Sequence, residues 1–270
     1  MSLSHSFIAY SIVYCSSRFD ILGLFLCFNS LVIFLIPSSV LIESIDSMVF
    51  SAFIFFGMLY YILMTVFSSK RLHPIARIIS RALLFFGGQW LIVKGKPPAD
   101  DEGPYLYLIN HASLFDTFMT VAAIPHYFTG VGKVEQFSYP IWGSLSKKYG
   151  MIPIDRSKIQ SAMGSLDELE KEIHNGVSAF VAPEGTRTLD GKLNEFKKGA
   201  FHVAKNTGIT IIPIILEGSF KAKRKNDWRI QPGVVTATLA EKITKEVYAN
   251  MNVNELKDHV RNIFESTLEK

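Results

Sequence analysis

The sequence contains very little cysteine, which excludes several kinds of site. Cys15 and Cys27 are the only two cysteines among 270 residues, and both lie in an apolar N-terminal segment. Such a pair supports neither a disulfide framework nor a thiolate metal site. The sequence also lacks a Gly-x-Ser-x-Gly pattern, the turn on which α/β-hydrolases present a nucleophilic serine. Nothing in the sequence implies a metal or another cofactor.

Charge is nearly absent from the N-terminal part of the chain. Between residues 21 and 67 only Glu43 and Asp46 are charged, and they separate two apolar runs, residues 21–36 or slightly beyond and residues 48–67. A helix that spans a membrane needs about 20 predominantly apolar residues. The pattern predicts a hairpin of two transmembrane helices, joined by a loop that carries both acids. The alternative is a pair of helices buried in a protein core.

Basic residues follow the second apolar run and predict its orientation. They are Lys70, Arg71, Arg77 and Arg81. Because excess Lys and Arg mark the cytoplasmic side of a membrane, the chain after Ser68 is predicted to be cytosolic. Residues 1–69, the predicted membrane anchor, hold one basic and three acidic residues, so residues 70–270 carry a net +6 in a chain of net +4. This balance suits an anionic membrane surface or anionic substrates, and no nucleic-acid-binding motif accompanies it.

The segment HPIARIISRALLFFGG, residues 73–88, has apolar and basic residues at helical spacing. Arg77 and Arg81 are four residues apart and share one face of such a helix. We predict an amphipathic helix over residues 70–89 that lies in the membrane interface, with its basic face towards lipid phosphates. An ordinary helix packed on the domain fits the same pattern, and both can hold at once.

Residues 90–270 alternate apolar runs of strand length with helical patterns. The predicted strands are Trp90–Val93, Tyr105–Ile109, Tyr127–Val131, Met151–Ile154, Ser178–Ala182, Thr210–Leu216 and Val234–Leu239. The predicted helices are Phe115–Ala123, Pro140–Tyr149, Ile159–His174, Gly199–Asn206 and Val253–Leu268. This alternation predicts an α/β domain with a central, mostly parallel sheet flanked by helices. Ligands of such sheets bind beyond the carboxyl ends of the strands.

One candidate catalytic pair follows a predicted strand. In INHASLFDTFM, residues 109–119, His111 and Asp116 are five residues apart. Such positions point about 140° apart on a regular helix, so the two side chains meet only if His111 precedes the helix and Asp116 opens it. A carboxylate on one ring nitrogen leaves the other nitrogen free as a base, and Asn110 could brace the turn. The alternative is a surface histidine that happens to lie near an aspartate.

A second polar motif, VAPEGTRT, also follows a predicted strand. Pro183 and Gly185 favour a tight turn, after which Arg187 offers a planar fork that can grip a phosphate. Glu184 would repel a phosphate, so it is predicted to accept a hydroxyl hydrogen or to hold Arg187. The alternative is a β-turn with a local ion pair.

Further basic residues follow other predicted strands. Lys133 and Arg156 lie at the two ends of the segment KVEQFSYPIWGSLSKKYGMIPIDR. Three predicted strand ends thus carry His111, Arg156 and Arg187, and a base beside two guanidinium groups indicates a phosphate substrate that bears a hydroxyl group. The predicted membrane hairpin indicates that this substrate lies in a membrane. Pro213 interrupts the strand GITIIPIIL and predicts an edge strand or a bulge.

These segments resemble the PlsC-type glycerolipid acyltransferases, the family of the 1-acylglycerol-3-phosphate acyltransferases. NHASLFD matches the family's first block, Asn-His-x4-Asp, and the segment from Lys133 to Arg156 matches the second. APEGTR matches the third block, usually Phe-Pro-Glu-Gly-Thr-Arg, and IIPI matches the fourth. The four blocks occur in order over about residues 90–220. Ala182 stands where the family commonly has Phe, which removes aromatic packing and no charge.

The resemblance implies a glycerolipid acyltransferase fold and a role for each matched residue. His111 would be the general base that lets the sn-2 hydroxyl of lysophosphatidic acid attack an acyl thioester, giving phosphatidic acid, and Asp116 would stabilise the protonated imidazole. The residues that would bind the glycerol phosphate are Arg156, Glu184, Gly185, Thr186 and Arg187. Lys133, by its side chain or a nearby backbone N–H, is the candidate to hold the oxyanion.

The sequence leaves the donor and the acceptor open. Acyl-CoA and an acidic acyl carrier protein are the possible donors, and glycerol 3-phosphate or another lysolipid is an alternative acceptor. A basic group could meet the donor's phosphates or form a solvated face; its members are Lys197, Lys198, Lys221, Lys223, Arg224 and Lys225. A non-catalytic membrane lipid-binding protein is the alternative from another class, but it would not need His111 and Asp116 together.

Overall fold

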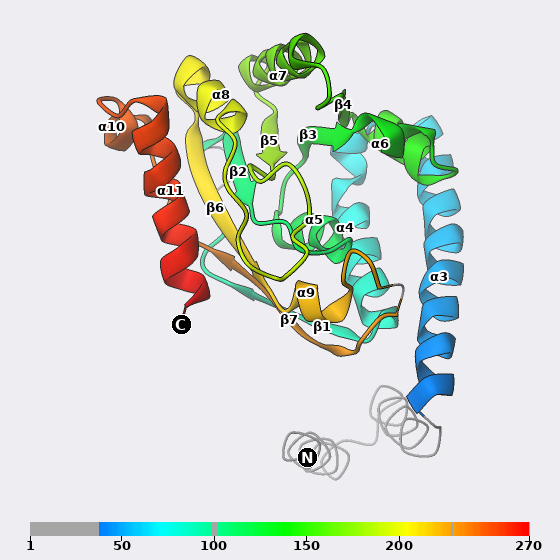
Figure 1. Cartoon of the computed structure of the whole chain (residues 1–270). Coiled ribbons are helices and arrows are strands. Elements are labelled where there is room, and N and C mark those ends of the chain that lie inside the picture. Colours follow the sequence, from blue (N-terminus) through cyan, green and yellow to red (C-terminus); the bar gives the residue numbers. More distant parts are fainter. Residues whose placement is uncertain (1–37, 99–101, 228, 270) are drawn as a thin grey trace. The chain divides into compact units, whose positions relative to one another are not determined.

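A computed structural model describes residues 38–98, 102–227 and 229–269 of the chain (Figure 1). Contacts divide the chain into two compact units, residues 1–46 and residues 47–270. The core, the sheet and the site described below all belong to the second unit. The first of the two predicted membrane runs, residues 21–36, lies outside the described residues.

Helix α3, Ser38–Val66, contains the second apolar run. Its part from Ser47 to Val66 is long and apolar enough to cross a membrane, and only 17% of its apolar window is buried. This exposure is the opposite of what a core helix shows. The predicted loop at Glu43 and Asp46 is wrong, because both residues lie within α3. Neither Gly nor Pro occurs between Ser38 and Phe56, so nothing interrupts the helix there.

Helix α4, Ser69–Phe86, is the predicted amphipathic helix, and it packs on the domain. Its buried face includes Leu72, Ala76 and Leu83, and it lies against helix α5, Phe115–Ala123. Arg81 does not point freely away from the domain, since Nη2 donates to the carbonyl of Ala122 over 3.2 Å. The interpretation as an ordinary packed helix therefore holds for this face.

Seven strands of the described residues form one sheet in the order β1-β7-β6-β2-β5-β3-β4. Their bounds are β1 Gln89–Lys94, β2 Tyr105–Ile109, β3 Phe128–Lys133, β4 Ile152–Ile154, β5 Ser178–Val181, β6 Thr210–Glu217 and β7 Gly233–Leu239. Every neighbouring pair is parallel except β6 with β7. The predicted mostly parallel sheet is confirmed, and the carboxyl ends of β2, β3, β4 and β5 lie at the same edge.

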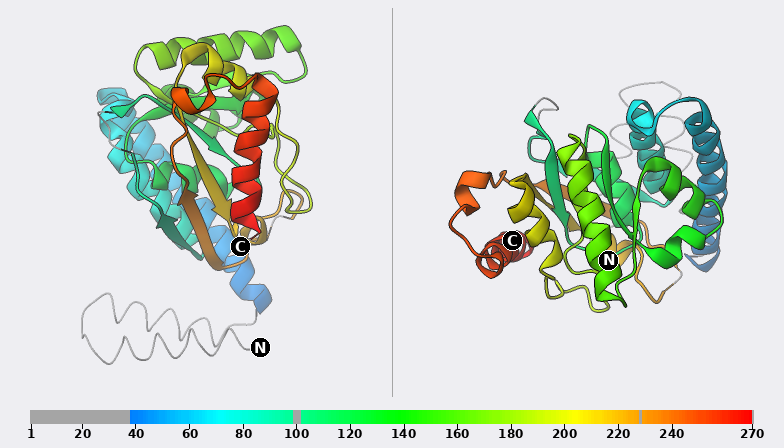
Figure 2. Two further views of the ribbon diagram at one scale, coloured as in Figure 1. Left: turned by 90° about the vertical axis from the view of Figure 1, so that its left-hand side faces the viewer. Right: turned by 90° about the horizontal axis from the view of Figure 1, so that it is seen from above.

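Helices cover both faces of the sheet (Figures 1 and 2). Helices α7, Ile159–His174, α8, Gly199–Thr207, and α11, Val253–Leu268, pack on one face, where their apolar side chains join those of β2 and β6 in one core. On the other face α5 contacts β6 and β7, while α4 contacts β1. Strand β2 is buried along its whole length, as expected when both faces are covered.

The remaining helices are short or flank the site. Helix α6, Trp142–Tyr149, was predicted to start two residues earlier, at Pro140. Three short elements were not predicted: the 3-10 helix η2, Val134–Ser138, and the helices α9, Ser219–Ala222, and α10, Lys245–Tyr248. Elements of four or five residues are too short to show a helical period in the sequence.

Strand β6 shows how the sheet accommodates Pro213. Of the two predicted alternatives, an edge strand or a bulge, the edge position is wrong, because β6 lies between β7 and β2. The register changes instead: two residues of β6 separate Ile211 from Ile214, whereas three separate their partners Leu239 and Ile243. The proline nitrogen, which cannot donate a hydrogen bond, falls at this interruption of the ladder, and its carbonyl accepts from the Ala240 N–H at 2.9 Å.

Candidate functional site

Four parallel strands end around one cavity of about 460 Å³. His111 follows β2, Lys133 ends β3, Arg156 follows β4, and Thr186 and Arg187 follow β5; all five line the cavity. Parallel strands place their carboxyl ends at one edge, so residues far apart in the sequence meet here. Gly185 lines the cavity as well, whereas Asp116 and Glu184 do not. The two acids lie behind the wall that the other side chains form.

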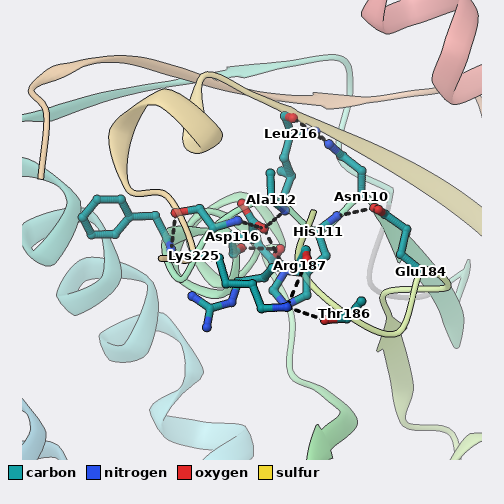
Figure 3. A network of polar contacts seen from close by, with 12 residues as sticks. Asn110, His111, Ala112, Asp116, Glu184, Thr186, Arg187, Leu216 and Lys225 are labelled. Atoms are coloured by element: carbon teal, nitrogen blue, oxygen red, sulfur yellow. Dashed lines mark hydrogen bonds and ion pairs between the residues drawn. The ribbon is translucent and has the colours of Figure 1, made fainter. Parts of the chain in front are cut away.

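His111 and Asp116 meet in the way the spacing required. His111 lies in the turn after β2, Asp116 lies in the first turn of α5, and Nδ1 and Oδ2 are 2.8 Å apart (Figure 3). Because a carboxylate only accepts, Nδ1 carries the proton and Nε2 presents a lone pair. Nε2 has no hydrogen-bond partner within the described part of the chain. The imidazole side chain is 25% exposed and borders the cavity.

Asp116 also shapes the turn that carries His111. Its Oδ2 accepts the backbone N–H groups of Ala112 at 2.7 Å and Ser113 at 2.8 Å. The side chain is fully buried, and Oδ1 has no partner among the residues the structure describes. One oxygen therefore fixes both the turn and the histidine ring, which prevents the imidazole from rotating away from the cavity.

Glu184 joins two loops instead of pointing into the cavity. Its Oε1 accepts the backbone N–H of His111 at 2.6 Å, and its Oε2 accepts that of Asn194 at 2.8 Å. The residue is only 3% exposed. Burial raises the pKa of Glu184, and the two backbone N–H groups partly oppose this shift. The predicted contact of Glu184 with Arg187 does not occur among the described residues.

Two further contacts fix the position of the His111 turn. The Asn110 amide spans the backbone of Leu216, accepting from N–H at 2.7 Å and donating to C=O at 2.9 Å. This matches the bracing role predicted for Asn110. The backbone N–H of Thr188 donates to the carbonyl of His111 at 2.9 Å. Hydrogen bonds thus join the turn of His111 to the VAPEGTRT segment.

The turn after β5 brings Thr186 and Arg187 to the cavity. Gly185 donates to the carbonyl of Ala182 at 3.0 Å and has φ of +72°, which is unfavourable for residues with a Cβ atom. A Cβ there would also lie 3.1 Å from Cε of Lys197. The tight turn predicted for this motif is present, and it requires glycine.

The cavity wall is rich in cations, and they differ in whether they form an ion pair. Over the described residues, the guanidinium groups of Arg156 and Arg187 have no ion pair, and partial burial lowers the pKa of Arg156. Lys133 differs, since Nζ lies 2.9 Å from Oε1 of Glu135 and both side chains are more than half exposed. Lys225 also lines the cavity; Nζ lies 3.1 Å from Oγ1 of Thr186 and 3.5 Å from the carbonyl oxygen of Arg187. Arg156 and Arg187 can therefore bind an anion without breaking an ion pair.

Beyond His111 the cavity becomes apolar. Its lining residues in this part come from α3, α4, α5, β3 and α6, and they include Phe53, Phe56, Gly57, Tyr60, Leu83, Val121, Phe128, Trp142 and Leu145. Sequence reasoning missed these residues, because their contribution depends on how α3 packs against the domain. Within the described chain, no group of three or more His, Cys, Asp or Glu side chains is placed to hold a metal ion.

Comparisons with known proteins identify similar sequences and a similar structure. A family model described as Acyltransferase matches residues 91–217. The 1-acyl-sn-glycerol-3-phosphate acyltransferase of Cocos nucifera is 29% identical over 69% of this chain and 60% of its own length. That of Limnanthes douglasii is 35% identical over 58% of this chain and 56% of its own length. The chain thus spans little more than half of these plant relatives.

A bacterial relative and a solved structure match more completely. The 1-acyl-sn-glycerol-3-phosphate acyltransferase of Escherichia coli K12 is 29% identical over 78% of this chain and 89% of its own length. The crystal structure of the 1-acyl-sn-glycerophosphate (LPA) acyltransferase PlsC from Thermotoga maritima superposes with a TM-score of 0.74 at 21% identity. It covers 85% of this chain and 94% of that one, which shows that the two share a fold.

Proposed function

We propose that the chain, which a family model described as Acyltransferase matches over residues 91–217, transfers an acyl group from a thioester to the sn-2 hydroxyl of 1-acylglycerol 3-phosphate. The product is phosphatidic acid, a precursor of phospholipids. The observation that carries the proposal is the position of His111. Its free Nε2 faces a cavity that has unpaired cations at one end and an apolar lining at the other.

His111 acts as the general base in this proposal. An alcohol is nearly as weak an acid as water and a far weaker acid than an imidazolium, so a histidine cannot deprotonate it before the attack begins. Nε2 takes the proton while the hydroxyl oxygen bonds to the thioester carbon. Asp116 stabilises the imidazolium that forms, and Nδ1 remains protonated throughout.

The tetrahedral intermediate then collapses. Its carbon–sulfur bond breaks, and the proton on Nε2 passes to the departing thiolate, which restores the neutral histidine. A thiol with a pKa of about 8.5 is a good leaving group, so no strong acid is needed. Lys133 is the proposed partner for the oxyanion, and its ion pair with Glu135 opens for this contact.

Arg156, Thr186 and Arg187 bind the glycerol phosphate. An arginine fork can grip two phosphate oxygens at once, and both guanidinium groups border the cavity. The apolar part of the cavity takes an acyl chain, since its aromatic and aliphatic lining suits a hydrocarbon. Gly185 lets the backbone come close to the ligand, while Glu184 holds the His111 turn from behind instead of touching the phosphate.

The proposed acceptor, lysophosphatidic acid, lies in the membrane that the protein contacts. The exposed apolar side of α3 lies in the membrane while its other side lines the cavity, and the domain after Ser68 lies on the cytosolic side, next to lysophosphatidic acid in the bilayer. The donor is a soluble thioester, acyl-CoA or acyl carrier protein, and the reaction needs no cofactor.

Acyl transfer to defined acceptors tests the proposal. The full chain, purified in detergent, is given labelled acyl-CoA or acyl carrier protein with lysophosphatidic acid, glycerol 3-phosphate or other lysolipids. We expect labelled phosphatidic acid from lysophosphatidic acid. Transfer only to another acceptor would replace the substrate but keep the chemistry. Binding of lysophosphatidic acid without transfer from either donor would favour a non-catalytic lipid-binding protein.

A further inference from the structure

Lys225 differs from the other basic residues near it. Lys221, Lys223, Arg224 and Lys225 lie together on α9 and the segment that follows it. Of these four, only Lys225 lines the cavity. Arg224 lies over the ring of Phe220, 5.5 Å from its centre, and Nζ of Lys223 donates to the carbonyls of Arg224 and Asp227. These four residues therefore do not form a single solvated basic face.

The backbone before Lys225 is fastened to the turn of the catalytic pair. The hydroxyl of Ser113, two residues after His111, donates to the carbonyl of Lys223 at 2.9 Å. This bond holds the segment next to the His111 turn, with Lys225 beside Thr186 and Arg187 (Figure 3). The two contacts of Nζ are to neutral oxygens, so the charge of the ammonium group is not balanced within the described structure.

From this arrangement we propose that Lys225 binds the phosphate of the acceptor together with Arg156 and Arg187. The inference rests on the proposed function for the identity of the acceptor, and it adds a residue that lies outside all four sequence motifs. A phosphate monoester carries nearly two negative charges at neutral pH and has three acceptor oxygens. Three cations from the segments after β4, β5 and α9 line the same cavity without an ion pair among the described residues, and they match that charge and those oxygens.

The alternative is that Lys225 only holds the turn of Thr186 and Arg187. The two roles predict different results, because a tether acts on every ligand while a phosphate contact acts only on phosphate-bearing ones. The probe is a short-chain lysophosphatidic acid, and the matched ligand is the monoacylglycerol with the same chain and no phosphate. Equilibrium binding to the full detergent-solubilised chain is measured by calorimetry.

We expect Lys225→Met to raise the dissociation constant of the lysophosphatidic acid about tenfold, ~1.4 kcal/mol, and to leave that of the monoacylglycerol unchanged. Lys225→Arg keeps the charge and should restore most of the affinity. The matched control is Lys221→Met, which removes a lysine that is exposed and lies outside the cavity. It should bind both ligands like the wild-type protein.

Several results would overturn the inference. One is equal affinity of Lys225→Met and Lys221→Met for lysophosphatidic acid in a protein that transfers acyl groups, which would leave the proposed function intact. Equal weakening for both ligands would make Lys225 a tether only. A higher KM for acyl-CoA with unchanged lysophosphatidic acid binding would assign Lys225 to the donor. Conversely, phosphate-dependent binding through Lys225 in a protein without transfer would support the inference and overturn the proposed function.

Discussion

Two sets of polar residues at the cavity differ in how the protein satisfies them. The brace, defined as Asn110, Asp116 and Glu184, lies behind His111 and is bonded to backbone groups on several loops (Figure 3). The rim, defined as Arg156, Arg187 and Lys225, faces the cavity, and among the described residues none of the three forms an ion pair, although the nearby Glu135 acts on the charge of Arg156. The hydrogen bonds of the brace fix the position of His111, whereas the charges of the rim are available to bind an anionic ligand.

The difference assigns separate kinetic roles to the two sets. Groups that orient the base matter most in the transition state, so their loss should lower kcat. Groups that hold the phosphate bind it before and during the reaction, so their loss should chiefly raise KM. The following substitutions test this division, beginning with the largest expected effect.

Loss of the base should have the greatest effect. His111→Ala removes the only imidazole that lines the cavity in the described structure, and we expect acyl transfer to fall roughly a thousandfold. The melting temperature should change little, because His111 is partly exposed. His202→Ala, on the exposed side of α8, is the matched control and should keep full activity. Substantial activity in a folded His111→Ala protein would remove the base from this account.

Asp116→Asn weakens the brace at its link to the base. The amide oxygen can still accept from the turn, but a neutral amide cannot stabilise the imidazolium, and we expect kcat to fall roughly a hundredfold. The KM for lysophosphatidic acid should remain close to the wild-type value. Steady-state assays with saturating acyl-CoA measure both. An unchanged kcat would mean that the carboxylate only shapes the turn.

Glu184→Gln should have a smaller effect on catalysis and a clear one on stability. The amide nitrogen of glutamine must face one of the two backbone N–H groups that Glu184 now accepts from. The mismatch should lower the free energy of unfolding by about 1–3 kcal/mol and kcat roughly tenfold. Denaturant unfolding and steady-state kinetics measure the two effects. Glu195→Gln, an exposed acid in the same loop, should leave both unchanged.

The apolar end of the cavity gives the smallest expected effect. A Cβ atom at Gly57 would lie 3.1 Å from Cγ2 of Ile141 and 3.3 Å from Cδ1 of Leu145, so Gly57→Leu should shorten the space for an acyl chain. We expect about a fivefold shift in kcat/KM towards shorter chains. Gly164→Leu, at an α7 position with no neighbour within 4 Å, should not change the preference. A series of acyl donors and acceptors of graded length measures it.

The local features of the chain were predictable from the sequence. The bounds of α5, α7 and α11 match the predicted helices, because each has a sustained apolar period. In α11 a capping box of Asn252 and Glu255 also marks the start. The contact of His111 with Asp116 was predictable too, since five residues separate them and only one arrangement of turn and helix lets them meet.

Features that depend on distant segments were not predictable. The two backbone N–H groups from which Glu184 accepts lie on loops that only the folded sheet brings together. The sequence therefore indicated a hydroxyl contact or a bond to Arg187, and the resemblance a phosphate contact, instead of a brace. The sequence predicted that Arg81 faces lipid phosphates, but its guanidinium donates to the carbonyl of Ala122 in α5. Lys225 lies on a loop without periodicity, and nothing in its neighbourhood separates it from Lys221 or Arg224. Its position depends on the bond of Ser113 to Lys223.

The most direct test compares one residue of each set in the same assay. We would measure kcat and the lysophosphatidic acid KM of Asp116→Asn and Arg187→Met at saturating acyl-CoA. The account predicts that Asp116→Asn lowers kcat at nearly constant KM, and that Arg187→Met raises KM at least about tenfold with a much smaller loss of kcat. If both substitutions changed the same parameter, the division between the brace and the rim would be contradicted.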